Sequence, residues 1–375
     1  MTRRVVHYVD SEVFGGSEEV ALHLLGSLDR ARWEPVLLYH AHPGIVRFVE
    51  GAERLGVRTR AVRPLPKRRR VAGVPALWRA IRAAHPAILH AHLSWPLACR
   101  YGIMAGWLAG VPALVGTAHL YVELQGGRRP PLTLRPLRRI IAVSDEVRAR
   151  YAGQLRVPDR KLAVVRNGIP VPRTVRRPDA RVRADLVRGR PDFVVLTPAR
   201  LHEQKGHTYL LAAAARIPDA TFVLAGDGPL RAPLEAQARE LGISERCLFL
   251  GQRTDVQDLL AAADLLVLPS LWEGLPVSVL EGMAAGVPIV ATAIAGTDEA
   301  VTNESNGLLV PPRDVGALAS AIRRVRGDAG LAARLARAGR ERVEREFSSD
   351  VMARNVTRIY DEIMREVEVG GDADG

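Results

Sequence analysis

Two glutamates eight positions apart are the residues best suited to chemistry. Glu273 follows an apolar run ending at Pro269, and Glu281 stands about one turn inside a helix predicted from Val277. Unpaired N–H groups at a helix start favour a phosphate, and a nearby carboxylate favours the hydroxyls of a polyol. A loop residue and an exposed helix residue are the alternative, but the surrounding Gly, Pro and Ser residues, including Ser270, favour a ligand site.

Two cations follow another predicted strand, Phe193–Thr197. Arg200 and Lys205-Gly206 come directly before a predicted helix. An arginine can hold a diphosphate with its planar fork, and a lysine can hold it as a point charge. A solvated basic loop is the alternative, and the signal at Glu273 favours the binding interpretation.

Two glycine-containing turns give weaker signals. Gly226-Asp227-Gly228 is only a fragment of a dinucleotide fingerprint, because Arg231 stands where the third glycine belongs. A tight turn that needs positive φ explains it as well. Gly15-Gly16 brings backbone close to a ligand, with Ser17 as a helix cap, or forms a plain turn.

Three histidines near strand ends are further candidates. His119 comes just after a predicted strand, where a ligand cleft is expected, although a structural histidine is the commoner case. His90 and His92 resemble a pair of metal ligands, but no third ligand is near them in sequence. We therefore expect no metal site.

Short apolar runs alternate with amphipathic stretches in two series, which predicts α/β architecture with parallel sheets. Ligands of such sheets bind beyond the carboxyl ends of the strands. The predicted strands are Val5–Val9, Val36–Tyr39, Ile88–His90, Ala113–Gly116 and Ile140–Val143, then Phe193–Thr197, Thr221–Ala225, Cys247–Leu250, Leu265–Pro269 and Pro288–Thr292.

The Pro- and Arg-rich stretch Val165–Pro191 is the predicted linker between the two series. We expect a first domain over residues 1–172 and a second over 173–350. The acidic, Gly-rich residues 367–375 are expected to be disordered.

Composition limits the class of protein. The 375 residues include 47% hydrophobic and 25% charged residues, which excludes a disordered or fibrous chain. Two cysteines exclude a disulfide framework. The N-terminus lacks a secretory signal pattern and the longest apolar stretch, Tyr101–Gly116, is too short to span a membrane, so we expect a cytoplasmic location.

The positive charge lies in the first half of the chain. The net charge is +12, with +16 in residues 1–175 and −4 in residues 176–375. This asymmetry indicates an anionic partner. Residues 64–85 combine a basic run with a helix bearing Leu77, Trp78 and Ile81, which either lies on an anionic membrane or faces the core. Nucleic acid is a weaker candidate, because no binding motif accompanies the basic run.

Together these residues resemble the retaining glycosyltransferases of family 4, which have the GT-B fold. The resemblance extends from Val5 to about Ile363 and implies two Rossmann-like domains facing each other across a cleft. It also implies that a C-terminal helix over residues 351–366 packs back on the first domain. The residues that carry it are Gly15-Gly16, His119, Asn167-Gly168-Ile169, Arg200, Lys205-Gly206, Gly226-Asp227-Gly228-Pro229, Glu273 and Glu281.

The resemblance implies a role for each matched residue. Arg200 and Lys205 should hold the diphosphate of a nucleotide-sugar donor, and Glu281 should bind the ribose. Glu273 should contact the sugar, helped by backbone N–H groups, and His119 should lie near the reaction centre. The remaining expected donor contacts are Gly15, Gly16, Gly274, Leu275 and Val277, with Asn167, Gly226, Asp227 and Ser270 as less certain ones.

The family's mechanism implies same-face attack, with the departing phosphate taking the acceptor's proton. We expect no metal or other cofactor. The acceptor is expected to be lipid-linked or anionic, in glycolipid or polysaccharide synthesis, with attachment at the inner face of the membrane. The alternatives are a nucleotide-sugar epimerase of similar fold, a basic nucleic-acid-binding protein and an NAD-dependent oxidoreductase, which the incomplete glycine fingerprint disfavours.

Overall fold

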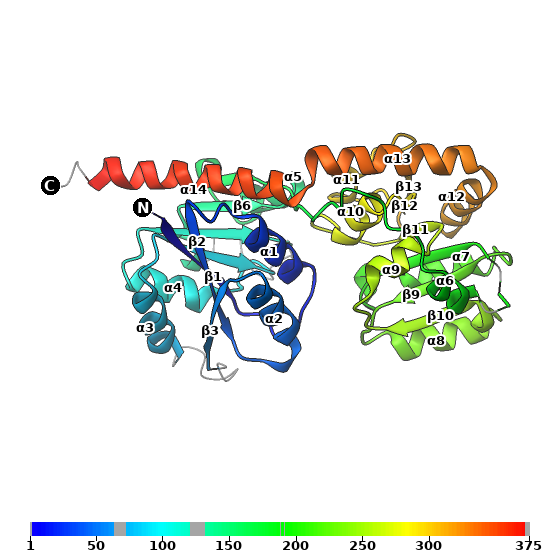
Figure 1. Cartoon of the computed structure of the whole chain (residues 1–375), viewed down its shortest axis with the longest axis horizontal. Coiled ribbons are helices and arrows are strands. Elements are labelled where there is room, and N and C mark those ends of the chain that lie inside the picture. Colours follow the sequence, from blue (N-terminus) through cyan, green and yellow to red (C-terminus); the bar gives the residue numbers. More distant parts are fainter. Residues whose placement is uncertain (1, 64–72, 121–131, 188, 191, 372–375) are drawn as a thin grey trace. The chain divides into compact units, whose positions relative to one another are not determined.

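The structure is a computed structural model that describes residues 2–63, 73–120, 132–187, 189–190 and 192–371. It divides into two compact units, Met1–Pro170 with Ser348–Gly375, and Val171–Phe347 (Figure 1). The predicted boundary after residue 172 lies two residues from this division. Each unit is built on one all-parallel sheet, which confirms the predicted α/β class.

The sheet of the first unit has the strand order β3-β2-β1-β4-β5-β6-β7. The order reverses next to β1, as in a doubly wound sheet. Its strands are β1 (Arg3–Val9), β2 (Trp33–His40), β3 (Arg58–Val62), β4 (Ile88–Leu93), β5 (Ala113–Ala118), β6 (Arg139–Ala142) and β7 (Leu162–Val164).

Helices cover both faces of this sheet. Gly102 of α4 lies against the ring of Tyr8, and the neighbouring residue His7 points to the opposite face, toward α14. Figure 1 shows α14 running along this unit. The helices are α1 (Gly16–Ser27), α2 (Val46–Arg54), α3 (Val74–Ala84), α4 (Arg100–Leu108), α5 (Asp145–Gly153) and α14 (Ser349–Gly371).

The sheet of the second unit has the order β10-β9-β8-β11-β12-β13. Its strands are β8 (Val194–Pro198), β9 (Thr221–Ala225), β10 (Cys247–Gly251), β11 (Leu265–Leu268), β12 (Ile289–Thr292) and β13 (Leu308–Val310). The helices are α6 (Ala180–Val187), α7 (His207–Ala214), α8 (Arg231–Glu240), α9 (Val256–Ala261), α10 (Val277–Ala284), α11 (Thr297–Ala300), α12 (Val315–Gly327) and α13 (Ala329–Glu346).

Three expectations need correction. Part of the predicted linker is helix α6, which packs in the second unit. Residues 367–371, expected in the disordered tail, continue the amphipathic helix α14, and residues 372–375 lie outside the described part. In the stretch 64–85, residues 64–72 also lie outside it, and Leu77 and Ile81 are fully buried, so the apolar stripe of α3 faces the core.

Candidate functional site

In the second unit, the loops that follow β8, β9 and β11 emerge side by side, because these parallel strands are neighbours in the sheet. The β8 loop carries Lys205 and the β11 loop carries Glu273. Lys205 Nζ lies 2.5 Å from Glu273 Oε1. The side chain of Glu273 is only 7% exposed and that of Lys205 is 18% exposed, so the ion pair is largely withdrawn from water.

Two further side chains orient the Glu273 carboxylate. Ser270 Oγ donates to Oε1 at 2.6 Å, and Gln204 Nε2 lies 3.5 Å from Oε2. Gln204 also joins the two loops. Its side-chain Nε2 donates to the Trp272 carbonyl at 2.9 Å, and its backbone carbonyl accepts from the Leu271 amide at 2.7 Å. The carboxylate is therefore held in one orientation before any ligand arrives.

Gly206 allows the β8 loop to approach the β11 loop. Its φ is +65°, and a Cβ at this position would lie 2.0 Å from the carbonyl oxygen of Pro269. Both the backbone conformation and the space require glycine. This close approach places the adjacent Lys205 beside Glu273.

Arg200 and Asp227 lie at the same edge of the sheet, exposed to solvent. Gly226 brings the β9 loop against the β8 loop, since a Cβ there would lie 2.1 Å from the Ala199 carbonyl oxygen. Gly226 and Gly228 are not among the residues with positive φ. The positive-φ explanation for this motif is therefore wrong, and close backbone contact is the reason for its glycines.

Helix α10 begins after the loop that carries Glu273. Pro276 is its N-cap residue, so Gly274, Leu275 and Val277 flank a position that has no N–H donor. Gly274 and Leu275 are buried. Glu281 is half-buried one turn inside the helix, where its Oε1 accepts from Gln257 Nε2 of α9 at 3.3 Å.

In the first unit, His119 follows β5 and is 9% exposed. Its Nε2 lies 3.2 Å from Nδ1 of His92, and the two rings stack with centroids 5.5 Å apart. Burial lowers the pKa of His119 to about 4, so the imidazole is neutral near pH 7.

The turn at Gly15-Gly16 differs from the expectation. Gly15, not Ser17, is the N-cap of α1, and its N–H donates to Glu18 Oε2 at 3.0 Å. Ser17 Oγ donates to the same carboxylate at 3.0 Å. The Gly15 amide, predicted to face a ligand, is therefore already engaged by a side chain of its own helix.

Asn167 is buried in the first unit, next to Gly168. The Gly168 amide lies 3.2 Å from the Met352 sulfur of α14, and the Gly168 carbonyl accepts from His23 Nδ1 at 3.2 Å. A Cβ on Gly168 would meet the Ser348 carbonyl at 2.5 Å. These contacts give Gly168 a structural role beside Ser348, where the chain returns to the first unit.

Sequence reasoning missed Gln204 and His7. Gln204 stands between two residues that were considered, and its position beside Lys205 in a strand-end loop was the available signal. His7 lies opposite His90 in the β1–β4 register. It brings a third ring nitrogen close to those of His90 and His92, since possible ligand atoms of the three lie within 4.8 Å of one another.

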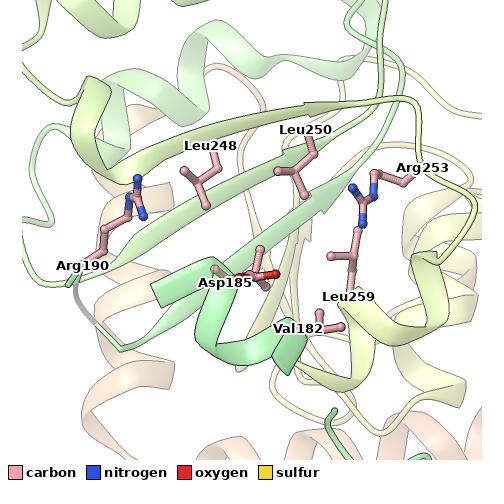
Figure 2. Close-up of a pocket in the computed structure, with 8 residues that line it drawn as sticks. Val182, Asp185, Arg190, Leu248, Leu250, Arg253 and Leu259 are labelled. Carbon is pink, nitrogen blue, oxygen red and sulfur yellow. The ribbon is translucent and has the colours of Figure 1, made fainter. Parts of the chain in front are cut away.

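A hollow of about 310 Å³ lies between α6, α9 and the edge strand β10, lined by leucines with Asp185, Arg190 and Arg253 (Figure 2). None of the predicted site residues lines it. The chemistry of the second unit is instead concentrated around Lys205 and Glu273.

Comparisons with known proteins agree with this geometry. Residues 180–342 match the family model Glycosyl transferases group 1, and residues 14–173 match Glycosyltransferase Family 4. The chain is 30% identical over 276 residues to UDP-Gal:alpha-D-GlcNAc-diphosphoundecaprenol alpha-1,3-galactosyltransferase of Escherichia coli, covering 68% of this chain and 70% of that one. It is 31% identical over 343 residues to 2-deoxystreptamine glucosyltransferase of Streptomyces kanamyceticus, covering 81% and 88%.

A solved structure has the same fold. The Anabaena Alr3699/HepE protein in complex with UDP and glucose superposes with a TM-score of 0.82 at 22% identity, over 96% of this chain and 99% of that one. The two parallel α/β units and both family matches lead to one conclusion. The chain belongs to the family 4 glycosyltransferases of group 1 and has the GT-B fold.

Proposed function

We propose that this glycosyltransferase takes its sugar from a nucleoside-diphosphate sugar and transfers it to an acceptor hydroxyl with retention of configuration. The ion pair of Lys205 and Glu273 carries the proposal, because it holds a cation for a diphosphate and a carboxylate for sugar hydroxyls at one sheet edge. A UDP-sugar is the first candidate donor, supported by the UDP-Gal of the Escherichia coli relative and the UDP in the Anabaena structure.

In the proposed reaction, the bond between the anomeric carbon and the diphosphate oxygen breaks. The acceptor oxygen bonds to the same face of that carbon, and its proton passes to the departing phosphate oxygen. Lys205 has N–H donors beyond the one directed at Glu273, and Arg200 adds a guanidinium, so both can stabilise the leaving charge. We assign Glu281 to the ribose hydroxyls and His119 to the reaction centre, and we expect no metal requirement.

Nucleotide binding tests the donor assignment. We expect UDP to raise the melting temperature of wild type in the presence of a chelator, and Lys205→Met and Glu281→Gln to reduce that shift. Arg239→Met removes an exposed cation of α8 and serves as the matched control. A screen of UDP, GDP and ADP with their sugars in which none shifts wild type would contradict the proposal.

Product analysis tests the reaction. Proton NMR of the product should show the same anomeric configuration as the donor. An inverted product would overturn retention, and a new sugar nucleotide formed without acceptor would favour the epimerase alternative.

We further propose a role in glycolipid or surface-polysaccharide synthesis at the inner face of a membrane. A lipid-linked diphosphate in the name of the Escherichia coli relative supports this acceptor class. Among the described residues, no helix is long and apolar enough to cross a bilayer. We propose that the attachment is peripheral.

A surface near the amino ends of β5, β6 and β7 is the best candidate for that attachment, in place of the buried stripe of α3. Trp107 and Leu108 are 62% and 55% exposed there. Trp107 also lines a hollow of about 630 Å³, and the other described residues around it include Arg135, Arg138, Arg139, Arg160, Lys161 and the acidic Glu366. Exposed apolar side chains beside a cluster of cations suit an anionic bilayer.

Vesicle flotation tests this surface. We expect binding to anionic vesicles at low salt, with loss of binding in Trp107→Ser/Leu108→Ser. The matched control is Val46→Ser/Leu55→Ser, which changes two exposed apolar residues elsewhere in the same unit. Equal flotation of both double variants would show that the surface is not the attachment site.

A further inference from the structure

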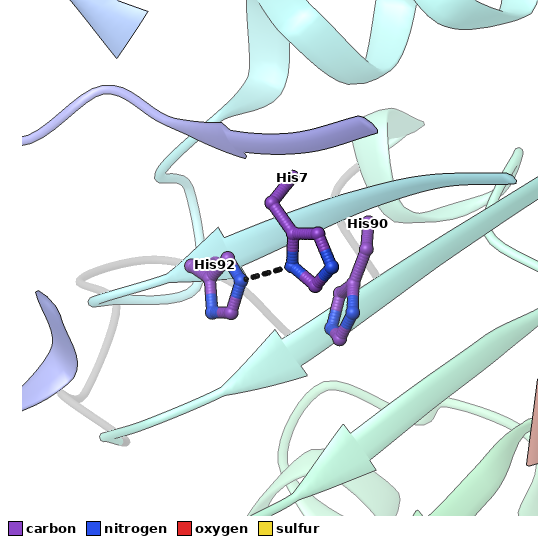
Figure 3. Close-up of side chains that lie close together, drawn as sticks. All are labelled: His7, His90 and His92. Atoms are coloured by element: carbon purple, nitrogen blue, oxygen red, sulfur yellow. Dashed lines mark hydrogen bonds between the residues drawn. The ribbon is translucent and has the colours of Figure 1, made fainter. Parts of the chain in front are cut away.

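Four buried histidines lie in a row on one face of the first sheet and end at the predicted reaction centre. His7 comes from β1, His90 and His92 from β4, and His119 follows β5. His7 Nδ1 lies 3.0 Å from His92 Nε2, the contact drawn in Figure 3, and His92 Nδ1 lies 3.2 Å from His119 Nε2. Three imidazoles are thus linked by two hydrogen bonds.

Because the rings are neutral, the two hydrogen bonds of this histidine row must both run in the same direction. Burial holds the pKa of His7, His90 and His92 well below the ordinary value and lowers that of His119 to about 4. A neutral imidazole has one N–H donor and one acceptor nitrogen. The N–H protons of both hydrogen bonds must therefore point toward His119, or both must point toward His7.

His7, at the end of the row away from His119, decides between these two directions. His7 Nε2 is buried and has no hydrogen-bond partner within the described part of the protein. A buried N–H without a partner is rarer and costlier than a lone pair without one. His7 Nε2 is therefore the unprotonated nitrogen, so His7 donates from Nδ1 to His92, and His92 donates from Nδ1 to His119 Nε2.

We propose that His7 and His92 are positioning residues that fix His119 in the Nδ1–H tautomer, as a neutral donor for a substrate oxygen. The role of His119 toward substrate rests on the proposed function, whereas its tautomer follows from the hydrogen bonds of the histidine row. A group behind a histidine is known to set its tautomer and orientation in enzyme sites. Here two further histidines serve that purpose, from inside the core.

The geometry does not favour a metal ion among His7, His90 and His92. Both nitrogens of His90 are engaged, Nε2 with Thr117 Oγ1 at 2.6 Å and Nδ1 with the Tyr360 hydroxyl. The rings of His90 and His92 stack at 4.7 Å with planes 16° apart. Imidazole lone pairs lie in the ring plane, so these two rings do not direct them at one point.

Tautomers can be read without any substrate. Isotope-labelled histidine in the full chain gives long-range proton–nitrogen spectra in which the two neutral tautomers differ. We expect the Nδ1–H form for His7, His92 and His119. The Nε2–H form at His119 would overturn the proposal, as would stoichiometric Zn²⁺ binding that shifts the His7 and His92 nitrogens.

Variants then test the link to activity. His7→Leu removes the first donor, so His119 should lose its fixed tautomer and kcat should fall at least about tenfold with little change in KM. His7→Asn places an amide donor near the Nδ1 position and should restore both the His119 tautomer and kcat. His23→Leu removes a half-buried histidine outside this row and should leave the His119 tautomer unchanged.

The outcomes separate the two proposals. If His7→Leu does not fold, the wild-type spectrum and His7→Asn still decide the tautomer. If His119 has the Nδ1–H tautomer but the protein binds no sugar nucleotide, the tautomer assignment stands and the proposed function is rejected. Active enzyme in which His7→Leu keeps full kcat would reject the positioning role.

Discussion

Lys205 and Glu273 are 68 positions apart in sequence, yet Nζ and Oε1 lie 2.5 Å apart at the carboxyl edge of the second sheet. The carboxylate therefore already occupies part of the hydrogen-bonding capacity of the cation assigned to the diphosphate. Binding of a donor must share or replace this contact. Under the proposed assignments, the pair links recognition of the phosphate to the position of the carboxylate proposed to bind the sugar.

Glu273→Gln separates these two roles. It removes the negative charge beside Lys205 while keeping the side-chain shape, so the ammonium becomes more available to a phosphate. We expect UDP to bind at least as tightly as to wild type by calorimetry, whereas turnover falls by about 100-fold. A fall in UDP affinity of more than about threefold would show that Glu273 supports nucleotide binding itself.

Gly206→Ala tests the close approach of the two loops. The substitution combines a strained backbone conformation with a clash against the Pro269 carbonyl oxygen. Gly242→Ala is the matched control, because φ is +68° there and nothing lies within 4 Å of the added Cβ. In urea unfolding we expect the control to cost about 1–2 kcal/mol and Gly206→Ala to cost clearly more, with loss of activity. Equal costs would contradict the clash.

Acidification should destabilise the protein through its buried histidines. His23, His119 and His207 have a pKa of about 4 in the folded protein, against an ordinary value of 6.5, chiefly because of burial. The unfolded chain therefore binds more protons as pH falls below about 6.5, and each group lowers the unfolding free energy by about 1.4 kcal/mol per pH unit down to about pH 4. Burial raises the pKa of Glu18, which acts in the opposite direction.

Urea unfolding at about pH 7.5 and about pH 5.5 checks this sign. His207→Leu removes one buried histidine, so it should shrink the difference between the two values by about 1.4 kcal/mol. Greater stability at the lower pH would contradict the expectation.

Tyr360→Phe tests how α14 is held on the first unit. The Tyr360 hydroxyl is buried and bonds to His90 Nδ1, and its ring packs against Trp33 with centroids 5.1 Å apart. Removing the hydroxyl leaves a buried ring nitrogen without this partner, so we expect a loss of about 1–3 kcal/mol in thermal or urea unfolding. Tyr209→Phe on α7 of the other unit is the control, and an equal loss there would argue against a specific anchor.

The alternation of apolar runs was sufficient to predict the interior strands and the two-sheet architecture. The three strands it missed, β3, β7 and β13, all lie at sheet edges. Arg58–Val62 illustrates the reason, since most of its residues are not buried and no apolar run marks it. An edge strand has a neighbour on only one side, so its sequence is under weaker demand for hydrophobic residues.

The sequence predicted where the candidate site residues lie, but not which side chains they contact. Strand-end loops identified Lys205, Glu273 and His119. The sequence did not show that Lys205 pairs with Glu273 or that His7 completes a row of histidines. Both depend on which parallel strands become neighbours, and strand order is a property of the whole sheet. The sequence also did not show that the Glu18 carboxylate accepts from the Gly15 N–H, the group predicted to face a ligand.

The first unit is assembled from both ends of the chain, since α14 belongs to it while the second unit lies between. During synthesis on the ribosome, all of residues 171–347 are made before α14. The first sheet is therefore not covered by this helix until synthesis reaches it. Until then the face around His90 and Trp33 lacks the cover that Tyr360 provides. A truncated product that ends near residue 347 would therefore hold a finished second unit and an unfinished first one. Packing of α14 is therefore the step that completes the first unit.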